Sequence, residues 1–434
     1  MRICKVKTLA FKNPKLQRDR PKVQITSESF LCLDSWPDGT PRISKASLPM
    51  LDDSPSMGSI GAPLHPTEEI LAFRYLEVPK ELLTVVKRPM IMWTETYLDI
   101  WHDGPSSQLQ SRFPISGAVC PASASVLATR TFVGILLREI NPGGKPSSYF
   151  FMHKRDRSES AAVPLNLEAL IVAEGDTMSS FSFLHEDSST VITTNPDNFC
   201  LDLWTLVGDA LQKTAVLLLP GLSASVKQCV HLECAPLDTF ESPRARQMRL
   251  GSGQNTSLIV GFNLAFHHVS HFTGQVVVLT DFALSFSRQR FITYPVVLRW
   301  LSWGPKNARI SPGKSDCNPF SGFFYTKQIG DLMSVYAVGD RPLSANKFMP
   351  IKRKRGSSQQ FYPVFANDAP SGVLDDSELI GRATHKCDWL FYYESWVYAF
   401  TRDRDTGVYT VNICYLRDSK VVNELVQKIN KESA

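Results

Sequence analysis

Short strand-like segments separated by turn residues are the feature that most limits what this chain can fold into. The 434 residues include 28 prolines and 24 glycines spread along the whole length. Proline inside a helix removes a hydrogen bond and clashes with the preceding turn, so long helices are excluded from most of the chain. Because 43% of the residues are hydrophobic, the chain can still bury a large core without disulfides or metal. The sequence therefore predicts a globular, all-β protein.

The clearest pair of strands lies near the C-terminal end. Residues 408–415 alternate between two sets of side chains with a period of two, which is typical of a β-strand. A second apolar run covers residues 396–400, and the residues between the two runs end in Gly407. These features predict a β-hairpin. Further strands are expected at 169–173, 181–184, 190–193, 199–206, 215–219, 258–266, 275–286, 291–298 and 332–338.

One short pattern occurs twice. Tyr97-Leu-Asp-Ile-Trp101 and Cys200-Leu-Asp-Leu-Trp204 are 103 residues apart, and each is followed within a few residues by glycine. In a β-propeller, such a segment is an inner strand whose aliphatic side chains enter the core between blades. The separation fits two or three blades of about 40–45 residues each. The repeat favours a degenerate β-propeller-like fold, with coincidence as the alternative.

Composition divides the chain into three parts. Residues 1–66 are polar and proline-containing, and we expect a poorly ordered basic region there. Residues 67–416 form the predicted β-propeller-like domain, with long loops at 235–256, 304–321 and 339–382. In residues 417–434, five apolar side chains recur at helical spacing and predict a short amphipathic C-terminal helix. They are Val421, Val422, Leu425, Val426 and Ile429.

The positive charge is concentrated at the N-terminal end. The net charge is +5, and residues 1–24 carry eight Lys/Arg against the single acid Asp19, which leaves −2 for the other 410 residues. A broad phosphate-binding face needs a basic excess over the body of the protein. Nucleic acid is therefore not expected as a partner.

The cysteines and apolar runs indicate an intracellular protein. Nine cysteines lie far apart in the sequence, as expected for free, buried thiols in a reducing compartment. The longest apolar runs, 132–137 and 215–219, are far shorter than the ~20 residues that span a bilayer. We expect the protein in the cytoplasm, the nucleus or both, with no membrane as a partner.

Motifs for phosphate binding and nucleophilic catalysis are incomplete. Gly144-Lys145 lacks the glycine and hydroxyl residue of a phosphate loop, because Glu139 and Pro146 stand there, and a turn is expected instead. Gly221-Leu-Ser-Ala-Ser225 has serine where a nucleophile elbow needs its second glycine, so we interpret it as a loop that leaves a strand. The sequence predicts no catalytic residue and no cofactor.

The densest groups of ligand-capable side chains do not match a metal site. Zinc usually takes four ligands in closely spaced pairs, whereas the two cysteines here are separated by four residues and no glutamate accompanies the histidines. We expect structural residues and no metal. The residues concerned are Cys229, His231, Cys234, His267, His268 and His271.

A basic run at Lys352, Arg353, Lys354 and Arg355 is predicted to be exposed, because four consecutive cations repel one another. A nuclear-import signal is one interpretation. A solvated loop and a phosphate contact are the alternatives.

The order of several segments resembles that of fungal, mushroom-type F-box proteins. The segments are Ser180–Asp187, Leu201–Trp204, Ala215–Leu222, Gln275–Leu279, Trp303–Arg309 and Trp396–Phe400. Among them the Trp-Gly-Pro-x-Asn-x-Arg element at 303–309 is the most specific. The resemblance covers a little over half of the chain and implies the degenerate β-propeller-like region that follows the F-box in that family.

In that family the F-box docks on a Skp-type adaptor, and the following region holds a substrate for ubiquitin transfer. Residues 76–83 of this chain resemble the opening of an F-box, but Met90–Trp93 and the strand-like Tyr97–Trp101 follow in place of amphipathic helices. The chain therefore has no complete F-box, and adaptor binding is in doubt.

Two functions from different classes remain. The first is a non-enzymatic scaffold that binds a protein partner through its three long loops and is linked to ubiquitin-ligase recruitment. The alternative is a hydrolase on a β-propeller or β-sandwich, which a central pocket lined by carboxylates or by His267 and His271 would favour. For the scaffold we expect Trp204, Trp303 and Trp396 to be mostly buried.

Overall fold

The fold is taken from a computed structural model of the chain. It describes residues 3–12, 22–26, 29–47, 57–77, 80–91, 93–103, 107–116, 120–129, 131–140, 146–155, 167–174, 177–184, 189–208, 210–234, 257–267, 271–287, 294–312, 324–329, 332–337, 365, 378–383, 389–393, 396–403 and 405–416.

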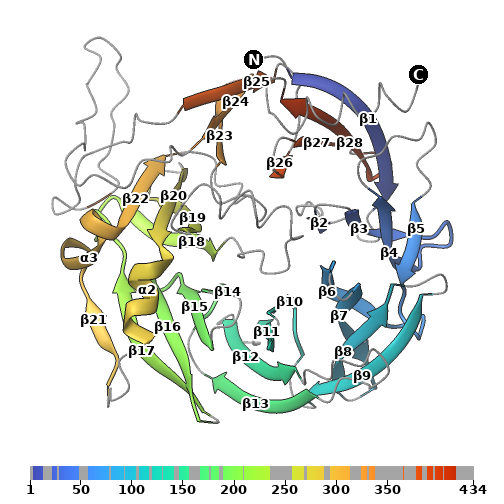
Figure 1. The fold of residues 1–434 in the computed structure, drawn as a ribbon, viewed down its shortest axis with the longest axis horizontal. Coiled ribbons are helices and arrows are strands. Elements are labelled where there is room, and N and C mark those ends of the chain that lie inside the picture. The colour runs from blue at the N-terminus through green and yellow to red at the C-terminus, as the bar shows by residue number, and fades with distance from the viewer. Residues whose placement is uncertain are drawn as a thin grey trace.

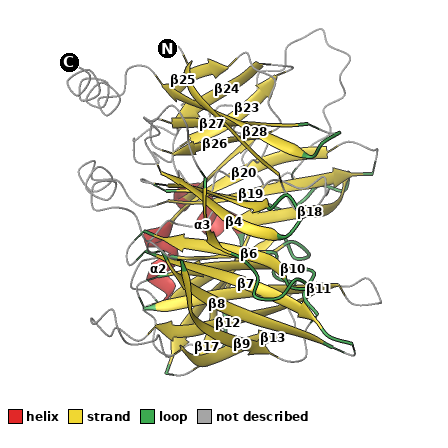
Figure 2. Cartoon of the chain, turned by 90° about the vertical axis from the view of Figure 1, so that its right-hand side faces the viewer, coloured by secondary structure: helices red, strands yellow, loops and turns green. Residues whose placement is uncertain are grey.

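The described strands form seven sheets arranged around a ring, like the blades of a β-propeller (Figure 1). In blades 1 to 6 the first strand in the sequence is the innermost. The prediction of an all-β, degenerate β-propeller-like fold is confirmed. Figure 2 shows how strands dominate the described chain, with two short helices beside them.

Blades 1 to 4 follow in chain order. Blade 1 contains β2 (Val23–Ile25), β3 (Ser29–Ser35), β4 (Pro41–Ser47) and β5 (Gly58–Gly61), and blade 2 contains β6 (Glu69–Leu76), β7 (Glu81–Pro89), β8 (Thr94–His102) and β9 (Gln108–Ser116). Blade 3 contains β10 (Ser123–Ala128), β11 (Phe132–Ile140), β12 (Pro146–Arg155) and β13 (Leu167–Glu174). Blade 4 contains β14 (Ser180–Phe183), β15 (Thr190–Asn195), β16 (Cys200–Val207), β17 (Ala210–Leu218) and the parallel β21 (Val296–Leu298).

Blades 5 to 7 complete the ring. Blade 5 contains β18 (Val226–Cys234), β19 (Ser257–Phe266), β20 (His271–Leu279) and β22 (Ala308–Pro312). Blade 6 contains β23 (Phe324–Ile329), β24 (Leu332–Ala337) and β25 (Glu378–Ala383). Blade 7 contains β26 (Trp389–Tyr393), β27 (Trp396–Arg402), β28 (Val408–Leu416) and β1 (Ile3–Lys12). The helices are α2 (Thr280–Ser287) and α3 (Trp300–Asn307).

Blade 7 closes the ring by pairing the two ends of the chain. β1 runs antiparallel to β28, from Ile3 opposite Leu416 to Lys12 opposite Val408. Phe11 stacks on Tyr409 at 5.3 Å between ring centroids. We expected a poorly ordered region at residues 1–66, but the structure has β1 to β5 there. Part of the core that buries Leu9 and Phe11, including Phe400 and Tyr409, comes from the distant end of the sequence, which local composition does not reveal.

The repeated Leu-Asp-x-Trp pattern occupies the same place in blades 2 and 4. Leu98 and Ile100 of β8 belong to the core shared by blades 2 and 3, and Leu201 and Leu203 of β16 belong to the core shared by blades 4 and 5. The tryptophan of each copy donates a hydrogen bond to a threonine of the preceding strand, from Trp101 Nε1 to Thr84 Oγ1 at 3.1 Å and from Trp204 Nε1 to Thr193 Oγ1 at 2.9 Å. The two copies are equivalent strands two blades apart, but each is the third strand of its blade and not the predicted inner strand.

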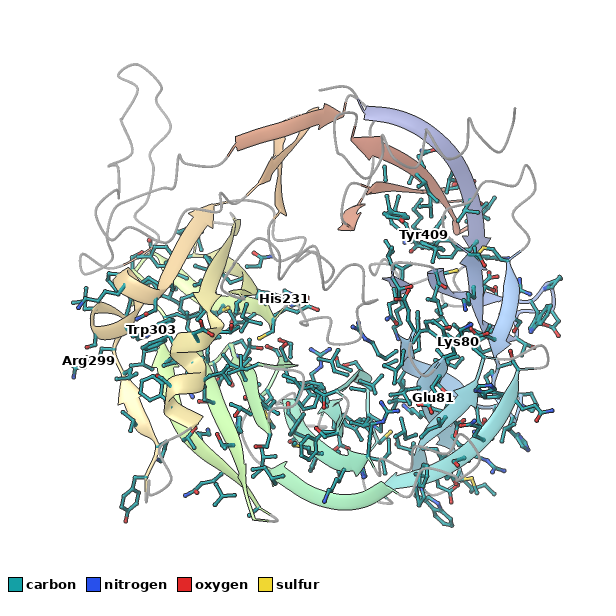
Figure 3. All side chains as sticks on the ribbon, viewed as in Figure 1. Lys80, Glu81, His231, Arg299, Trp303 and Tyr409 are labelled. Atoms are coloured by element: carbon teal, nitrogen blue, oxygen red, sulfur yellow. The ribbon has the colours of Figure 1, made fainter. Side chains whose placement is uncertain are left out.

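The Trp-Gly-Pro element begins inside α3, on the outer side of the ring (Figure 3). Trp303 is 1% exposed, and its Nε1 donates to the carbonyl oxygen of Leu218 at 3.0 Å. Gly304 is required because a Cβ atom there would lie 2.3 Å from the Trp300 ring. The expected loop at 304–321 is therefore corrected, since α3 and β22 occupy its first part. Their backbone hydrogen bonds and aromatic packing replace the predicted loop structure.

Several other predictions concern residues that the structure describes only in part. Trp204 is half-buried, and the side chain of Trp396 lies outside the described residues. The loop at 235–256, the C-terminal helix at 417–434 and the run Lys352, Arg353, Lys354 and Arg355 also lie outside them. Within 339–382, Phe365 pairs with Leu222 in an isolated bridge, and β25 begins at Glu378.

Candidate functional site

The inner strand of blade 5 carries an irregular, polar stretch. β18 pairs with β19, and the register shifts between Val226 and Gln228 and again between Cys229 and His231. Each shift is a β-bulge or a similar irregularity, which re-aims the side chains beside it, and bulges are over-represented next to active sites. His231 lies inside the ring in Figure 3, whereas Trp303 lies towards its outer side.

After the second register shift, the side chains of β18 alternate between a buried face and an exposed face. Leu232 and Cys234 lie opposite the buried Phe262 and Val260, so they face the core between blades 4 and 5. His231 lies opposite Asn263 and is on the other face of the strand. Its neighbour at i+2, Glu233, shares that face because side chains alternate along a strand.

His231 and Glu233 form a hydrogen-bonded pair. Nε2 of His231 lies 2.9 Å from Oε2 of Glu233, and the two side chains are 46% and 40% exposed. When Nε2–H donates to the carboxylate, Nδ1 keeps the lone pair of the neutral imidazole. A histidine held in this way by a carboxylate, with access to solvent, can act as a base.

Two further polar groups belong to the surroundings of this pair. Oδ1 of Asn263, on the strand beside His231, is buried and has no hydrogen-bond partner within the described part of the chain. Nε of Arg138 in β11 is buried in the same way. Burial lowers the pKa of Arg138, and the charge of Glu233 opposes that shift.

The cysteines of β18 are not suited to nucleophilic attack. Burial raises the pKa of Cys229 to about 11, and burial raises the pKa of Cys234 to about 12. Since the thiolate is the nucleophile, both are held in the unreactive thiol form near neutral pH. The Cys229 Sγ donates to the backbone oxygen of His231 at 3.2 Å and not to its ring.

The other histidines considered from sequence are separate from this pair. His267 is exposed, and its backbone N–H donates to the carbonyl oxygen of Ser225 at 3.2 Å. His271 begins β20 opposite Ala265, while His268 lies outside the described residues. Over the part of the chain that the structure describes, no group of three or more His, Cys, Asp or Glu residues could hold a metal ion.

The remaining motif at Gly221–Ser225 forms the connection between β17 and β18, as predicted for a loop that leaves a strand. Gly144-Lys145 lies outside the described residues. Sequence reasoning considered His231 only as a metal ligand and did not consider Glu233. The one available signal was their i, i+2 spacing in a segment that can form a strand. No described helix is long and apolar enough to cross a membrane.

No family model matches the chain, and no curated protein matches it. Among solved structures, a candidate 6-phosphogluconolactonase from Bacteroides fragilis is similar over 72% of this chain and 78% of its own, with 9% identity and a TM-score of 0.36. A second candidate 6-phosphogluconolactonase, from Bacteroides uniformis, is similar over 72% of this chain and 79% of its own, with 10% identity and a TM-score of 0.35.

These comparisons contradict the expectation of a non-enzymatic protein-binding scaffold for ubiquitin-ligase recruitment, which is therefore corrected: both similar structures are candidate enzymes. Neither structure tells what this chain acts on, because identity is 9–10% and the TM-scores are 0.36 and 0.35. The resemblance to fungal F-box proteins stays a prediction, since no comparison addresses it.

Proposed function

We propose that this chain is a hydrolase that cleaves an ester or lactone bond, with His231 as the general base and Glu233 as the residue that orients it. The observation that carries the proposal is the 2.9 Å contact between Nε2 and Oε2, on the inner strand of a blade, with the imidazole 46% exposed. A base held by a carboxylate through one nitrogen can remove a proton through the other.

The reaction needs only water as the second reactant. Nδ1 of His231 takes a proton from water while the water oxygen attacks the carbonyl carbon. The Glu233 carboxylate stabilises the imidazolium that forms. When the tetrahedral intermediate collapses, the C–O bond to the leaving oxygen breaks, and the imidazolium returns its proton to that oxygen. The products are a carboxylic acid and an alcohol, which stay joined in one molecule if the substrate is a lactone.

Arg138 is a positively charged residue that responds to the charge of Glu233. Its buried Nε has no hydrogen-bond partner among the residues described. A positive charge near a reacting carbonyl stabilises the developing oxyanion. We assign Arg138 this electrostatic role.

The test is hydrolysis of a substrate panel by the purified full-length chain. The panel contains p-nitrophenyl acetate and butyrate, γ-butyrolactone, gluconolactone and 6-phosphogluconolactone, the last because two propellers of similar fold are candidate 6-phosphogluconolactonases. We expect turnover of at least one member, and a loss of about 100-fold or more in kcat for His231→Gln.

Lys227→Gln is the matched control, because Lys227 is an exposed residue of the same strand. It should retain wild-type turnover. Rates equal to buffer for every substrate, or equal rates for the wild type and His231→Gln, would refute the proposal.

A further inference from the structure

Several large apolar side chains are exposed on three connecting segments of blades 1 and 2. Trp36 in the β3–β4 turn is 40% exposed, and Leu64 in the β5–β6 connection is 55% exposed. In the β7–β8 turn, Met90 is 37%, Ile91 101% and Trp93 55% exposed. We call these five residues the apolar rim.

The strand registers place all three segments at the same end of the blades. Ser35 lies opposite Pro41 and Ile43 opposite Gly61, so the β3–β4 turn and the start of the β5–β6 connection share one end of blade 1. Glu69 lies opposite Lys87, so the same connection meets the β7–β8 turn in blade 2. The three segments of the rim therefore lie at the same end of two neighbouring blades.

The β7–β8 turn is the most projecting part of the rim. The backbone N–H of Met90 donates to the carbonyl oxygen of Trp93 at 2.8 Å, which closes a tight turn with Ile91 at its tip. Tips of this kind normally carry Gly, Asn, Asp, Ser or Pro. Covering the fully exposed isoleucine there would remove apolar surface from water, which is favourable.

The charges beside the rim largely cancel. Arg42 is bound by Asp34 at 2.7 Å, and Arg112 binds Glu68 at 2.8 Å. Arg88 lies opposite Glu95 in the β7–β8 register. Lys87 and the exposed Asp38 bind neutral backbone groups, so they add one charge of each sign. This near-neutral surface complements a surface with no net charge, and it lacks the basic excess that anionic lipids attract.

We infer that the apolar rim inserts into the headgroup region of a zwitterionic lipid surface. Two tryptophans beside aliphatic tips match the composition of interfacial segments, in which the indole lies at headgroup level and the aliphatic group lies deeper. Exposed apolar turn tips suit a fluid partner, since lipids rearrange around them and a rigid protein surface would need matching pockets. This peripheral contact does not involve a membrane-spanning segment and revises the expectation that no membrane is a partner.

The experiment is flotation of the full-length chain with phosphatidylcholine vesicles. We expect the wild type to float with the vesicles, equally well in 0.1 M and about 0.5 M salt, because electrostatic attraction is screened by salt and apolar insertion is not. Ile91→Asp and Trp93→Asp should each lower the partition coefficient by about tenfold or more. Unchanged circular dichroism of both variants shows that the fold is intact.

Val207→Asp is the matched control. Val207 is 50% exposed and is the last residue of β16. It therefore lies at the end of blade 4 that is far from the β15–β16 turn. It should float like the wild type. A folded wild type that does not float, floating that the rim variants leave unchanged, or floating that requires anionic lipid and disappears in salt would each overturn the inference.

Discussion

Replacing Trp303 by alanine is expected to lower the free energy of unfolding by about 3–5 kcal/mol. The side chain is 1% exposed, and its ring stacks on Phe282 at 5.8 Å and packs edge-on against Trp300 at 5.1 Å between centroids. Alanine would leave a cavity between these rings. It would also leave the carbonyl oxygen of Leu218 without the indole donor, which adds about 1 kcal/mol to the loss.

Urea unfolding followed by circular dichroism measures this loss, with two variants beside it. Trp303→Phe keeps an aromatic ring in place and loses the indole donor, so we expect a smaller effect of about 1–2 kcal/mol. Trp93→Ala removes a tryptophan that is 55% exposed and should cost under about 1 kcal/mol. If Trp303→Ala were no more destabilising than Trp93→Ala, the packing of α3 on blades 4 and 5 would be refuted.

Two other predictions concern ionisable groups. Because burial raises the pKa of Cys229 to about 11, iodoacetamide should label Cys229 far more slowly than the exposed Cys120 at pH 8. Labelling of Cys229 should accelerate as the pH rises to about 11. Peptide mass spectrometry measures both rates, and equal rates at pH 8 would refute the prediction. Burial raises the pKa of Asp103, but hydrogen bonds from Lys45 and Tyr75 lower it by more, so the pKa lies below its usual value. The ionised carboxylate therefore stabilises the fold at neutral pH. This stabilisation is lost as the pH falls through the pKa of the folded state. Asp103→Asn should therefore lower the free energy of unfolding by about 1–2 kcal/mol at pH 7 and by less at pH 3; an equal loss at both pH values would contradict the assignment.

Local periodicity was sufficient for the parts of the fold that local pairing builds. The predicted hairpin at 396–415 is β27 and β28, with Trp396 opposite Tyr415 and Gly407 in the left-handed conformation at φ 70°. The predicted strand at 275–286 was only half right. β20 ends at Leu279, directly after the β-branched run Val276–Val278. α2 starts at Thr280 with Asp281 in its first turn, where an acid interacts favourably with the helix dipole.

Long-range pairing accounts for what the sequence did not reveal. The pairing of β1 with β28 depends on residues about 400 positions apart, which no local window contains. The same holds for the candidate site. A histidine two residues before a glutamate is common, and what distinguishes His231 is the register shift of β18 against β19 and the inner position of β18 in its blade.

The most direct test of the account is a double-mutant cycle on kcat/KM with His231→Gln, Glu233→Gln and the double variant, using the panel substrate that the wild type hydrolyses fastest. If Glu233 acts through His231, each single change removes the same function, and the double variant should be about as slow as His231→Gln alone. Losses that multiply would mean that the two residues act independently. Single variants as active as the wild type would exclude the pair from the reaction.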